Sequence, residues 1–349
     1  MPSAQSVNKT FTIVARDDSK TATEIAGANR YETAAKIALQ TYPSGSNGAI
    51  VCAGGNYPDS LAASSLAGLL DYPIVTTEKD ALSDATRSAI ERLSSGKQNF
   101  KVLVVGGSAA VSDATEAALA AMAGVNSLER LEGANRYLTQ MAVYDYGRRL
   151  DVQAETGRQW GNSFIIATGS SFADALSIAP YAAKMRAPVF LVDSSAGFIQ
   201  RVEGALNSSA IRGRNMTAII VGGTAVVSED IRARVAELAE PARIERLAGE
   251  TRYETSRAIA EYCVRTLPYE FTYDGTAFTT GRNFADALAG GVMQSKRGSL
   301  IVLVDPGALA GAELVAANNQ FVFDIFYLGG TSAVPQDLRD QINSMIGTG

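Results

Sequence analysis

A block of seven residues occurs three times along the chain, and this repetition constrains the fold more than any single residue does. The copies begin at Gly27, Gly133 and Gly249, and each reads Gly-x-x-Arg-Tyr-x-Thr. Successive copies lie 106 and 116 residues apart. Because copies of one repeat adopt one structure, each marks a structural unit. The chain is therefore expected to present related surfaces up to three times.

Three further blocks follow each copy in the same order. A Gly-x-x-(Phe/Tyr)-x-Asp block is followed by a short apolar run and then by a second apolar run that ends in Gly-Gly. The twelve blocks divide the chain into an N-terminal extension and three repeats, predicted at residues 1–21, 22–124, 125–241 and 242–349. The second repeat carries the largest insertion, around residues 151–162, which is polar and holds the only tryptophan, Trp160. We expect this insertion to form a surface loop.

Strands and helices alternate within each repeat. In the first repeat, the apolar runs predict buried strands, whereas periodic segments predict helices. The expected strands are 49–53, 73–76 and 102–105, and the expected helices are 30–39, 59–70, 83–93 and 112–121. This alternation predicts an α/β fold in which each repeat is a Rossmann-like unit with a parallel sheet. Each repeat is long enough to bury its own core, so we expect three compact units around a pseudo-threefold axis.

Composition excludes several classes of protein. The chain is 46% hydrophobic and 19% charged, as expected for a folded protein, and no apolar run approaches the length of about 20 residues that spans a membrane. No signal peptide is visible, and membrane insertion is not expected. The net charge of −5 disfavours nonspecific nucleic-acid binding.

The chain contains no histidine and only two cysteines. The lack of histidine excludes Ser-His-Asp and Cys-His catalysis and zinc hydrolases with histidine ligands. Two cysteines argue against a disulfide scaffold and a cysteine-type zinc site. We therefore predict no cofactor, no metal site and no catalytic residue.

The recurring polar residues are expected at the carboxyl edge of each sheet, where open parallel sheets bind ligands. The recurring arginine lies at a helix N-terminus, where a cation opposes the helix dipole by about 0.3–1 kcal/mol. An anion must offset this cost. It is either the recurring Asp of the second block, in an internal ion pair, or a bound ligand. The candidate ligand-binding residues are Arg30, Tyr31, Asp59, Arg136, Tyr137, Asp174, Arg252, Tyr253 and Asp286, with the glycines Gly106, Gly107, Gly222, Gly223, Gly329 and Gly330.

Each of these groups also has a purely structural interpretation. The aspartates open helices, where a carboxylate accepts backbone N–H groups. The tyrosines suit half-buried packing better than sugar stacking. The Gly-Gly loops could cradle phosphate, but they match neither the Walker pattern nor Gly-x-Gly-x-x-Gly, so a tight strand-to-helix turn is the simpler explanation.

A metal-dependent phosphoryl-transfer site would require further carboxylates beside the recurring aspartate. Asp193 and Asp305 end the third strand in the second and third repeats, but the first repeat has Thr76-Thr77 there. This incomplete acidic set argues against metal catalysis.

The order and content of the twelve blocks resemble the type 2 cell-wall-binding repeat, over nearly all of residues 24–345. The resemblance implies a pseudo-trimer of Rossmann-like, toprim-like units and a surface or S-layer-associated protein of a Gram-positive bacterium, secreted to the cell wall. It also implies non-covalent, non-catalytic anchoring to an anionic wall polysaccharide, with a separate functional domain often attached. No such domain is visible outside the repeats.

Two departures from the pattern predict unequal sites. The third copy has Glu250-Thr251 before its arginine, and Pro335 replaces Ser112 and Ser228 of the other copies. Some proteins of this family carry an amidase label, but a zinc amidase requires histidine ligands, so such a label would belong to another domain. A cell-wall anchor is the leading hypothesis, followed by a surface-lattice scaffold and then by the phosphoryl-transfer enzyme.

Overall fold

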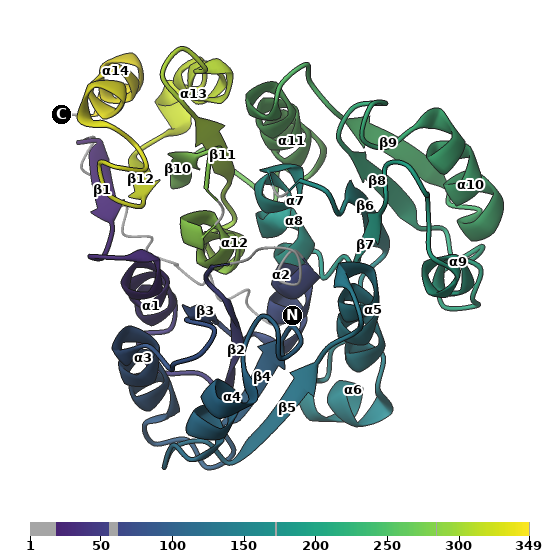
Figure 1. Ribbon diagram of the computed structural model, residues 1–349. Helices are drawn as coiled ribbons and strands as arrows, with labels where there is room; N and C mark the ends of the chain where they lie inside the picture. The colour runs from purple at the N-terminus through teal and green to yellow at the C-terminus, as the bar shows by residue number, and fades with distance from the viewer. Residues whose placement is uncertain (1–18, 56–61, 172, 284, 349) are drawn as a thin grey trace, which may run out of the picture.

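The computed structural model describes residues 19–348 apart from 56–61, 172 and 284, and the side chains of 285–287 also lie outside the described part. Nearly all of the predicted N-terminal extension is therefore not described. Within the described residues, the chain forms three four-stranded parallel sheets with helices on their faces (Figure 1). The predicted α/β class and the threefold arrangement are confirmed.

The first repeat follows the predicted alternation closely. The predicted strands match the structure to within one residue, because a parallel sheet covered on both faces requires nearly continuous apolar runs. Its elements are β1 (Thr21–Ile25), α1 (Arg30–Thr41), β2 (Gly48–Ala53), α2 (Ala63–Leu70), β3 (Ile74–Thr77), α3 (Asp84–Ser94), β4 (Lys101–Val105) and α4 (Asp113–Ala120).

The second repeat has the same order with an added helix. Its elements are β5 (Ser127–Leu131), α5 (Arg136–Gly147), α6 (Leu150–Thr156), β6 (Ser163–Thr168), α7 (Ala173–Ser177), α8 (Ala179–Lys184), β7 (Val189–Val192), α9 (Gln200–Leu206), β8 (Thr217–Val221) and α10 (Glu229–Ala239). The added helix α6 lies in the insertion, so the prediction of a loop there was wrong. Trp160 closes the insertion: its ring stacks on Tyr144 and its Nε1 donates to the Tyr144 carbonyl oxygen at 3.1 Å.

The third repeat completes the chain. Its elements are β9 (Arg243–Leu247), α11 (Arg252–Thr266), β10 (Thr276–Thr280), α12 (Ala285–Arg297), β11 (Ile301–Val304), α13 (Ala310–Ala316), a 3₁₀ turn (Asn319–Phe321), β12 (Asp324–Leu328) and α14 (Gln336–Ile346).

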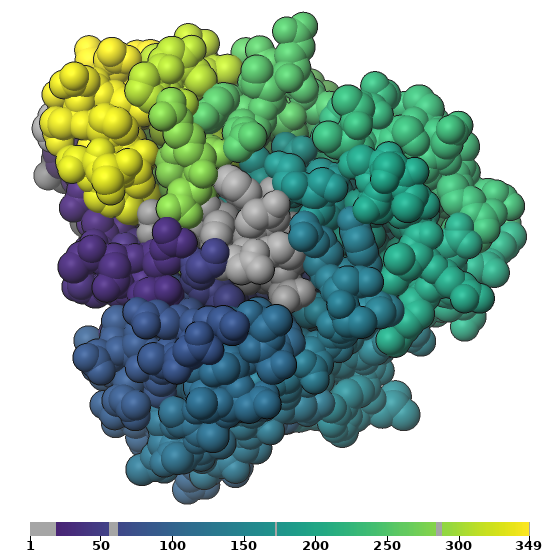
Figure 2. Space-filling model, viewed as in Figure 1, coloured from purple at the N-terminus to yellow at the C-terminus, as the bar shows by residue number. Residues whose placement is uncertain are grey.

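In each sheet, one edge strand comes from a neighbouring repeat. The strand orders are β3-β2-β4-β5, β7-β6-β8-β9 and β1-β12-β10-β11. The first strand β1 therefore pairs in parallel with β12, near the other end of the chain, and closes the three repeats into a ring. In Figure 2 the purple N-terminal segment lies beside the yellow C-terminal one, and the repeats form three lobes around a common centre. The predicted boundaries near residues 125 and 242 fall just before β5 and β9. We call β1, β5 and β9 the crossover strands, because each completes the sheet of a neighbouring repeat.

Helices from all three repeats meet at the centre of the ring, where α2, α8 and α12 pack against one another (Figure 1). Glycine permits this close approach. A Cβ added to Gly68 on α2 would lie 2.0 Å from the Ala183 carbonyl oxygen on α8, and one added to Gly291 on α12 would lie 2.7 Å from the Ala179 Cβ. The ring thus has a packed centre.

Candidate functional site

The recurring glycine that opens each Arg-Tyr block is required by close packing. Its N–H donates to the hydroxyl of the threonine six residues later, at 3.0 to 3.1 Å in the three copies. A Cβ at Gly27, Gly133 or Gly249 would come within 2.2 to 2.4 Å of a side-chain Cβ in the following helix. Gly and Thr in this block therefore fix the turn into the helix.

The residue before each arginine caps the helix. The side chains of Asn29 and Asn135 accept backbone N–H groups of the first turn. In the third copy Thr251 does the same and forms a capping box with Glu254. Thr251 thus replaces asparagine without loss of the cap, so this departure leaves the local structure intact.

Each recurring arginine binds a backbone carbonyl oxygen of the second block. Nη1 of Arg30 donates to the Gly54 oxygen at 2.7 Å, and Nη1 of Arg252 donates to the Gly281 oxygen at 2.6 Å. Arg136 donates in the same way to the Gly169 oxygen. The arginine therefore ties the helix start to the end of the first inner strand of its own repeat.

Each recurring tyrosine packs on that same glycine. A Cβ at Gly54, Gly169 or Gly281 would lie 2.4 to 2.7 Å from the tyrosine ring, so no larger residue fits. The hydroxyl groups of Tyr137 and Tyr253 donate to the carboxylates of Asp193 and Asp305 at 3.0 and 3.1 Å. Burial and these carboxylates raise the pKa of both tyrosines, which keeps the phenol protonated as a donor.

The first repeat also has an acidic residue at the position of Asp193 and Asp305. Comparison of the repeat sequences missed it. The strand register places Thr77, Val192 and Val304 at the same level, so the next residues are Glu78, Asp193 and Asp305. Burial and the charge of Glu78 raise the pKa of Tyr31. The expectation of an incomplete acidic set at Thr76-Thr77 was therefore wrong. Even so, no group of three or more metal-ligating His, Cys, Asp or Glu side chains occurs among the described residues.

Of the three recurring aspartates, Asp174 lies within the described residues, and it is buried. Only 9% of Asp174 is exposed, and burial raises the pKa of its carboxyl group, an effect that the charge of Arg252 opposes. Arg252 belongs to the following repeat, and helix α11 packs against α7. The charge of a recurring arginine thus acts on a recurring aspartate across a repeat boundary, while an ion pair between the two residue types stays a prediction. Asp59 and the side chain of Asp286 lie outside the described residues.

The first glycine of each Gly-Gly loop has a structural role. Gly106, Gly222 and Gly329 have φ values of 120°, 104° and 94°, in the region that favours glycine. Their N–H groups donate to the last residue of the neighbouring crossover strand. Their carbonyl oxygens each accept from an arginine, at 2.8 to 2.9 Å. A phosphate-binding role stays a prediction that would depend on the second glycines, Gly107, Gly223 and Gly330.

The carboxyl edges differ in charge between repeats. In the third repeat a cavity of about 190 Å³ is lined by Arg282 and Asp305, whose side chains form an ion pair at 2.7 Å. In the first repeat a cavity of about 570 Å³ is lined by Glu32, Glu78 and Asp84. An acidic cavity repels an anionic ligand, so the edges of the first and third repeats are not equivalent sites for one.

Comparison with known proteins identifies the repeats. The model of the family described as cell wall binding domain 2 matches residues 24–116, 130–232 and 246–339. The chain belongs to the cell wall binding domain 2 family. The matched segments coincide with the three repeats, which we call the three cell wall binding repeats.

Two relatives come from Bacillus subtilis. The chain is 26% identical to the N-acetylmuramoyl-L-alanine amidase LytC, covering 92% of this chain and 58% of the relative. It is 25% identical to a protein named amidase enhancer, covering 95% of this chain and 41% of the relative. The chain therefore spans about half the length of these relatives.

Solved structures share the fold. Cwp6 and Cwp8 from Clostridium difficile superpose with TM-scores of 0.78 and 0.77 at 21% sequence identity. Both alignments cover 94% of this chain, with 48% of Cwp6 and 52% of Cwp8. No described helix is long and apolar enough to cross a membrane.

The structure also reveals a basic cavity that no single motif predicts. It measures about 340 Å³ and lies where α2, α8 and α12 end, so residues of all three cell wall binding repeats line it. Its charged lining residues are Asp71, Arg158, Lys184, Arg186 and Lys296. Asp71 accepts from Lys296 at 2.7 Å and lies 3.7 Å from Arg158. We call this the axial basic cavity. Because its residues are not repeated, only the assembled ring brings them together.

Proposed function

We propose that this chain anchors a protein to the bacterial cell wall by binding an anionic wall glycopolymer without catalysis. Family membership supports wall binding, and the relatives support a location at the cell surface after secretion. The chemistry of the ligand is our inference from charge. Since the chain spans about half of its Bacillus relatives, the role of anchoring an attached domain is part of the proposal.

The axial basic cavity is the observation that best supports an anionic ligand. The chain as a whole has a net charge of −5, yet this cavity has four basic side chains and one carboxylate in its lining. Lys184 also pairs with Glu270 at 3.2 Å. Arg186 is half-buried and faces the cavity. Local positive charge of this kind attracts an anion even when the whole protein is acidic.

The volume of the cavity suits a small part of a polymer. Ligand pockets commonly measure about 300–1,000 Å³, so about 340 Å³ accommodates one anionic sugar or phosphate-bearing unit. The three Arg-Tyr blocks are the alternative binding places, since each lies at a carboxyl edge. A polymer with repeating charges would engage several such places and gain avidity.

Co-sedimentation with purified cell wall tests the proposal and separates the two places. The axial variant Arg158→Gln/Arg186→Gln removes two cations, and exposed cations contribute about 0.5–1 kcal/mol each, so affinity is expected to fall about 5- to 30-fold. The matched control Arg201→Gln/Arg214→Gln removes two exposed arginines elsewhere on the second repeat and should bind like the wild type. Equal binding by all three proteins would contradict an axial site.

The Arg-Tyr blocks are tested with the triple variant Arg30→Ala/Arg136→Ala/Arg252→Ala. Loss of wall binding by the folded triple variant, with the axial variant unaffected, would assign the ligand to the carboxyl edges. Unchanged binding would leave these arginines a structural role.

A scaffold role is the second candidate, and one observation favours it. Every recurring arginine donates to a backbone carbonyl of its own repeat, and the tyrosine packs on the same glycine. These contacts hold the fold together whether or not a ligand binds. A chain that is fully retained on wall stripped of polymer would favour this candidate.

A further inference from the structure

The three crossover strands carry a charged residue at one equivalent position. Arg130 on β5 lies opposite Val104, Arg246 on β9 lies opposite Ile220, and Glu24 on β1 lies opposite Tyr327. In each case the partner is the penultimate residue of the neighbouring strand. Two crossover strands thus bring a cation to this level, whereas the strand that closes the ring brings an anion.

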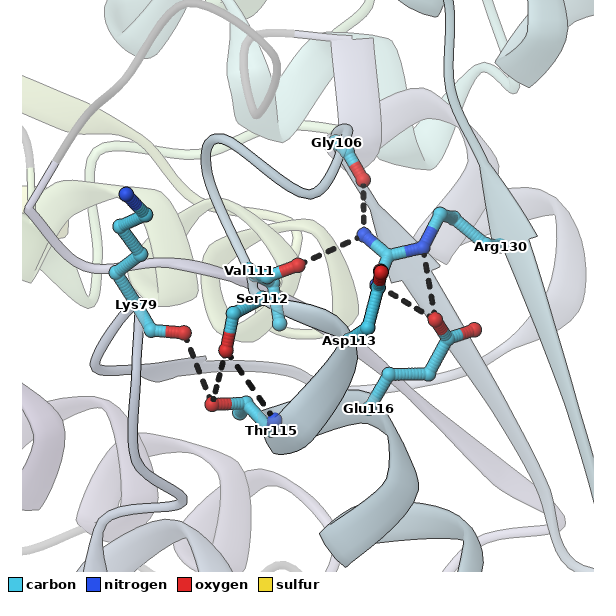
Figure 3. Close-up of polar contacts among 8 residues, drawn as sticks. All are labelled: Lys79, Gly106, Val111, Ser112, Asp113, Thr115, Glu116 and Arg130. Carbon is cyan, nitrogen blue, oxygen red and sulfur yellow. Dashed lines mark hydrogen bonds and ion pairs between the residues drawn. The ribbon is translucent and has the colours of Figure 1, made fainter.

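In the sheet of the first repeat the charged residue at this position is Arg130, and its guanidinium binds several protein groups. Figure 3 shows the Arg130 guanidinium between the Gly-Gly loop and the start of α4. It donates to the carbonyl oxygens of Gly106 and Val111 at 2.8 and 2.9 Å, and it pairs with Glu116 at 2.6 Å. Only 10% of the Arg130 side chain is exposed. Arg130 on the crossover strand β5 therefore binds both the Gly-Gly loop and helix α4 of the preceding repeat.

The second repeat has the same arrangement. Arg246 donates to the carbonyl oxygens of Gly222 and Val227 at 2.9 and 2.8 Å. Its other terminal nitrogen pairs with Glu229, the first residue of α10, at 2.9 Å.

In the third repeat the charges are reversed across the same contact. Arg339, on helix α14, donates to the equivalent carbonyl oxygens of Gly329 and Val334 at 2.9 and 2.8 Å. Its remaining nitrogen pairs with Glu24 on β1. The guanidinium thus comes from helix α14 of the third repeat, and the carboxylate comes from the crossover strand β1. Only 7% of the Arg339 side chain is exposed.

We propose that this reversed pair makes the third sheet selective for β1 over β5 and β9, so that the ring closes in one strand order. A crossover strand carrying arginine would bring a second guanidinium to carbonyls that Arg339 already occupies. Conversely, β1 on the first sheet would place Glu24 beside Glu116 and leave the Gly106 and Val111 carbonyls without their arginine. A strand with arginine at this position is therefore disfavoured on the third sheet by like charge, and β1 is disfavoured on the first sheet by like charge and by unpaired buried groups.

The second repeat shows that an arginine on the helix is not enough. Arg232 occupies the fourth position of α10, as Arg339 does in α14, but 46% of its side chain is exposed. There Glu229 opens the helix and receives the crossover arginine, whereas the third repeat has Gln336 at that position. Selectivity thus depends on the buried Arg339 together with the uncharged Gln336 at the first position of α14.

Charge reversal in the full chain tests the proposal. Glu24→Arg places two guanidinium groups together, so we expect amide exchange in Thr21–Ile25 to accelerate about tenfold or more. The double variant Glu24→Arg/Arg339→Glu recreates the arrangement of the first repeat and should restore slow exchange in β1. The matched control Arg130→Glu should destabilise the first repeat and leave exchange in β1 unchanged.

Hydrogen exchange gives the readout. Exchange in β6 and β8 serves as an internal standard, since these strands lie in the second sheet. If Glu24→Arg fails to fold, recovery of folding by the double variant still supports the proposal. Two results would overturn it: unchanged exchange in β1 of Glu24→Arg, or a double variant that is no better than the single one.

Discussion

Replacing Arg130 by methionine tests how strongly the crossover arginine holds two repeats together. The change keeps an unbranched apolar stem and removes a guanidinium whose side chain is 10% exposed. The Gly106 and Val111 carbonyl oxygens lose their donor, and each unsatisfied buried group costs about 1–3 kcal/mol. Glu116 is also left without its partner, and breaking a buried ion pair costs about 3–5 kcal/mol. Because Glu116 is partly exposed and water reaches the loop, we expect a loss of about 3 kcal/mol in the free energy of unfolding.

Native-state hydrogen exchange is the appropriate assay for this variant, since three linked repeats need not unfold in one step. The slowest amides of β4 and β2 should exchange faster by an amount equivalent to about 3 kcal/mol, while β6 should change much less. Arg201→Met is the control, because Arg201 is 55% exposed and its pair with Asp145 contributes about 0–1 kcal/mol. A change below about 1 kcal/mol, or one equal to that of the control, would refute the reasoning.

Three further outcomes are expected. Gly169→Ala should destabilise the second repeat by about 1–3 kcal/mol in thermal melting, because its Cβ would lie 2.7 Å from the Tyr137 ring; melting at the wild-type temperature would contradict this. Hydrogen bonds from the Ser195 side chain and from the Ala196 and Ser195 N–H groups, with a smaller contribution from Tyr137, lower the pKa of Asp193. Its stabilisation is therefore present above about pH 4 and is lost as the pH falls through the lower folded-state value; urea titrations of wild type and Asp193→Asn should converge in acid, and a constant difference would count against it. Wall binding should weaken as sodium chloride rises from low concentration to about 0.5 M, and salt-independent binding would argue against charge recognition.

The elements were predictable because their signals are local. The strands at 49–53 and 102–105 were found to within one residue, since nearly continuous apolar runs mark strands buried on both faces. The helix predicted at 112–121 begins as expected, because the Ser112 side chain accepts the Thr115 N–H and caps it. The insertion was the exception: helix α6 is held by its place beside α5 and by Trp160, neither of which appears in a local pattern.

Contacts between repeats could not be predicted in the same way. The sequence of the strand Ser127–Leu131 does not indicate that it completes the sheet of the preceding repeat. Arg130 and Glu116 therefore gave no signal as a pair. Glu78 was overlooked because only the strand register aligns it with Asp193. The axial basic cavity combines residues that do not recur, so repeat comparison passes over them.

The glycines were interpreted correctly as turn residues but for an incomplete reason. The first glycine of each Gly-Gly loop needs its positive φ, and its carbonyl oxygen also receives the crossover or helix arginine. The second-block glycine receives the tyrosine ring, which sequence spacing does not reveal.

Retention of the chain on purified cell wall, before and after chemical removal of the anionic secondary polymer, tests the central claim most directly. The fraction of protein that sediments with the wall is measured at low salt for both preparations. The proposed function predicts strong retention on intact wall and a large loss on the stripped wall. Equal retention on both preparations would contradict recognition of an anionic polymer.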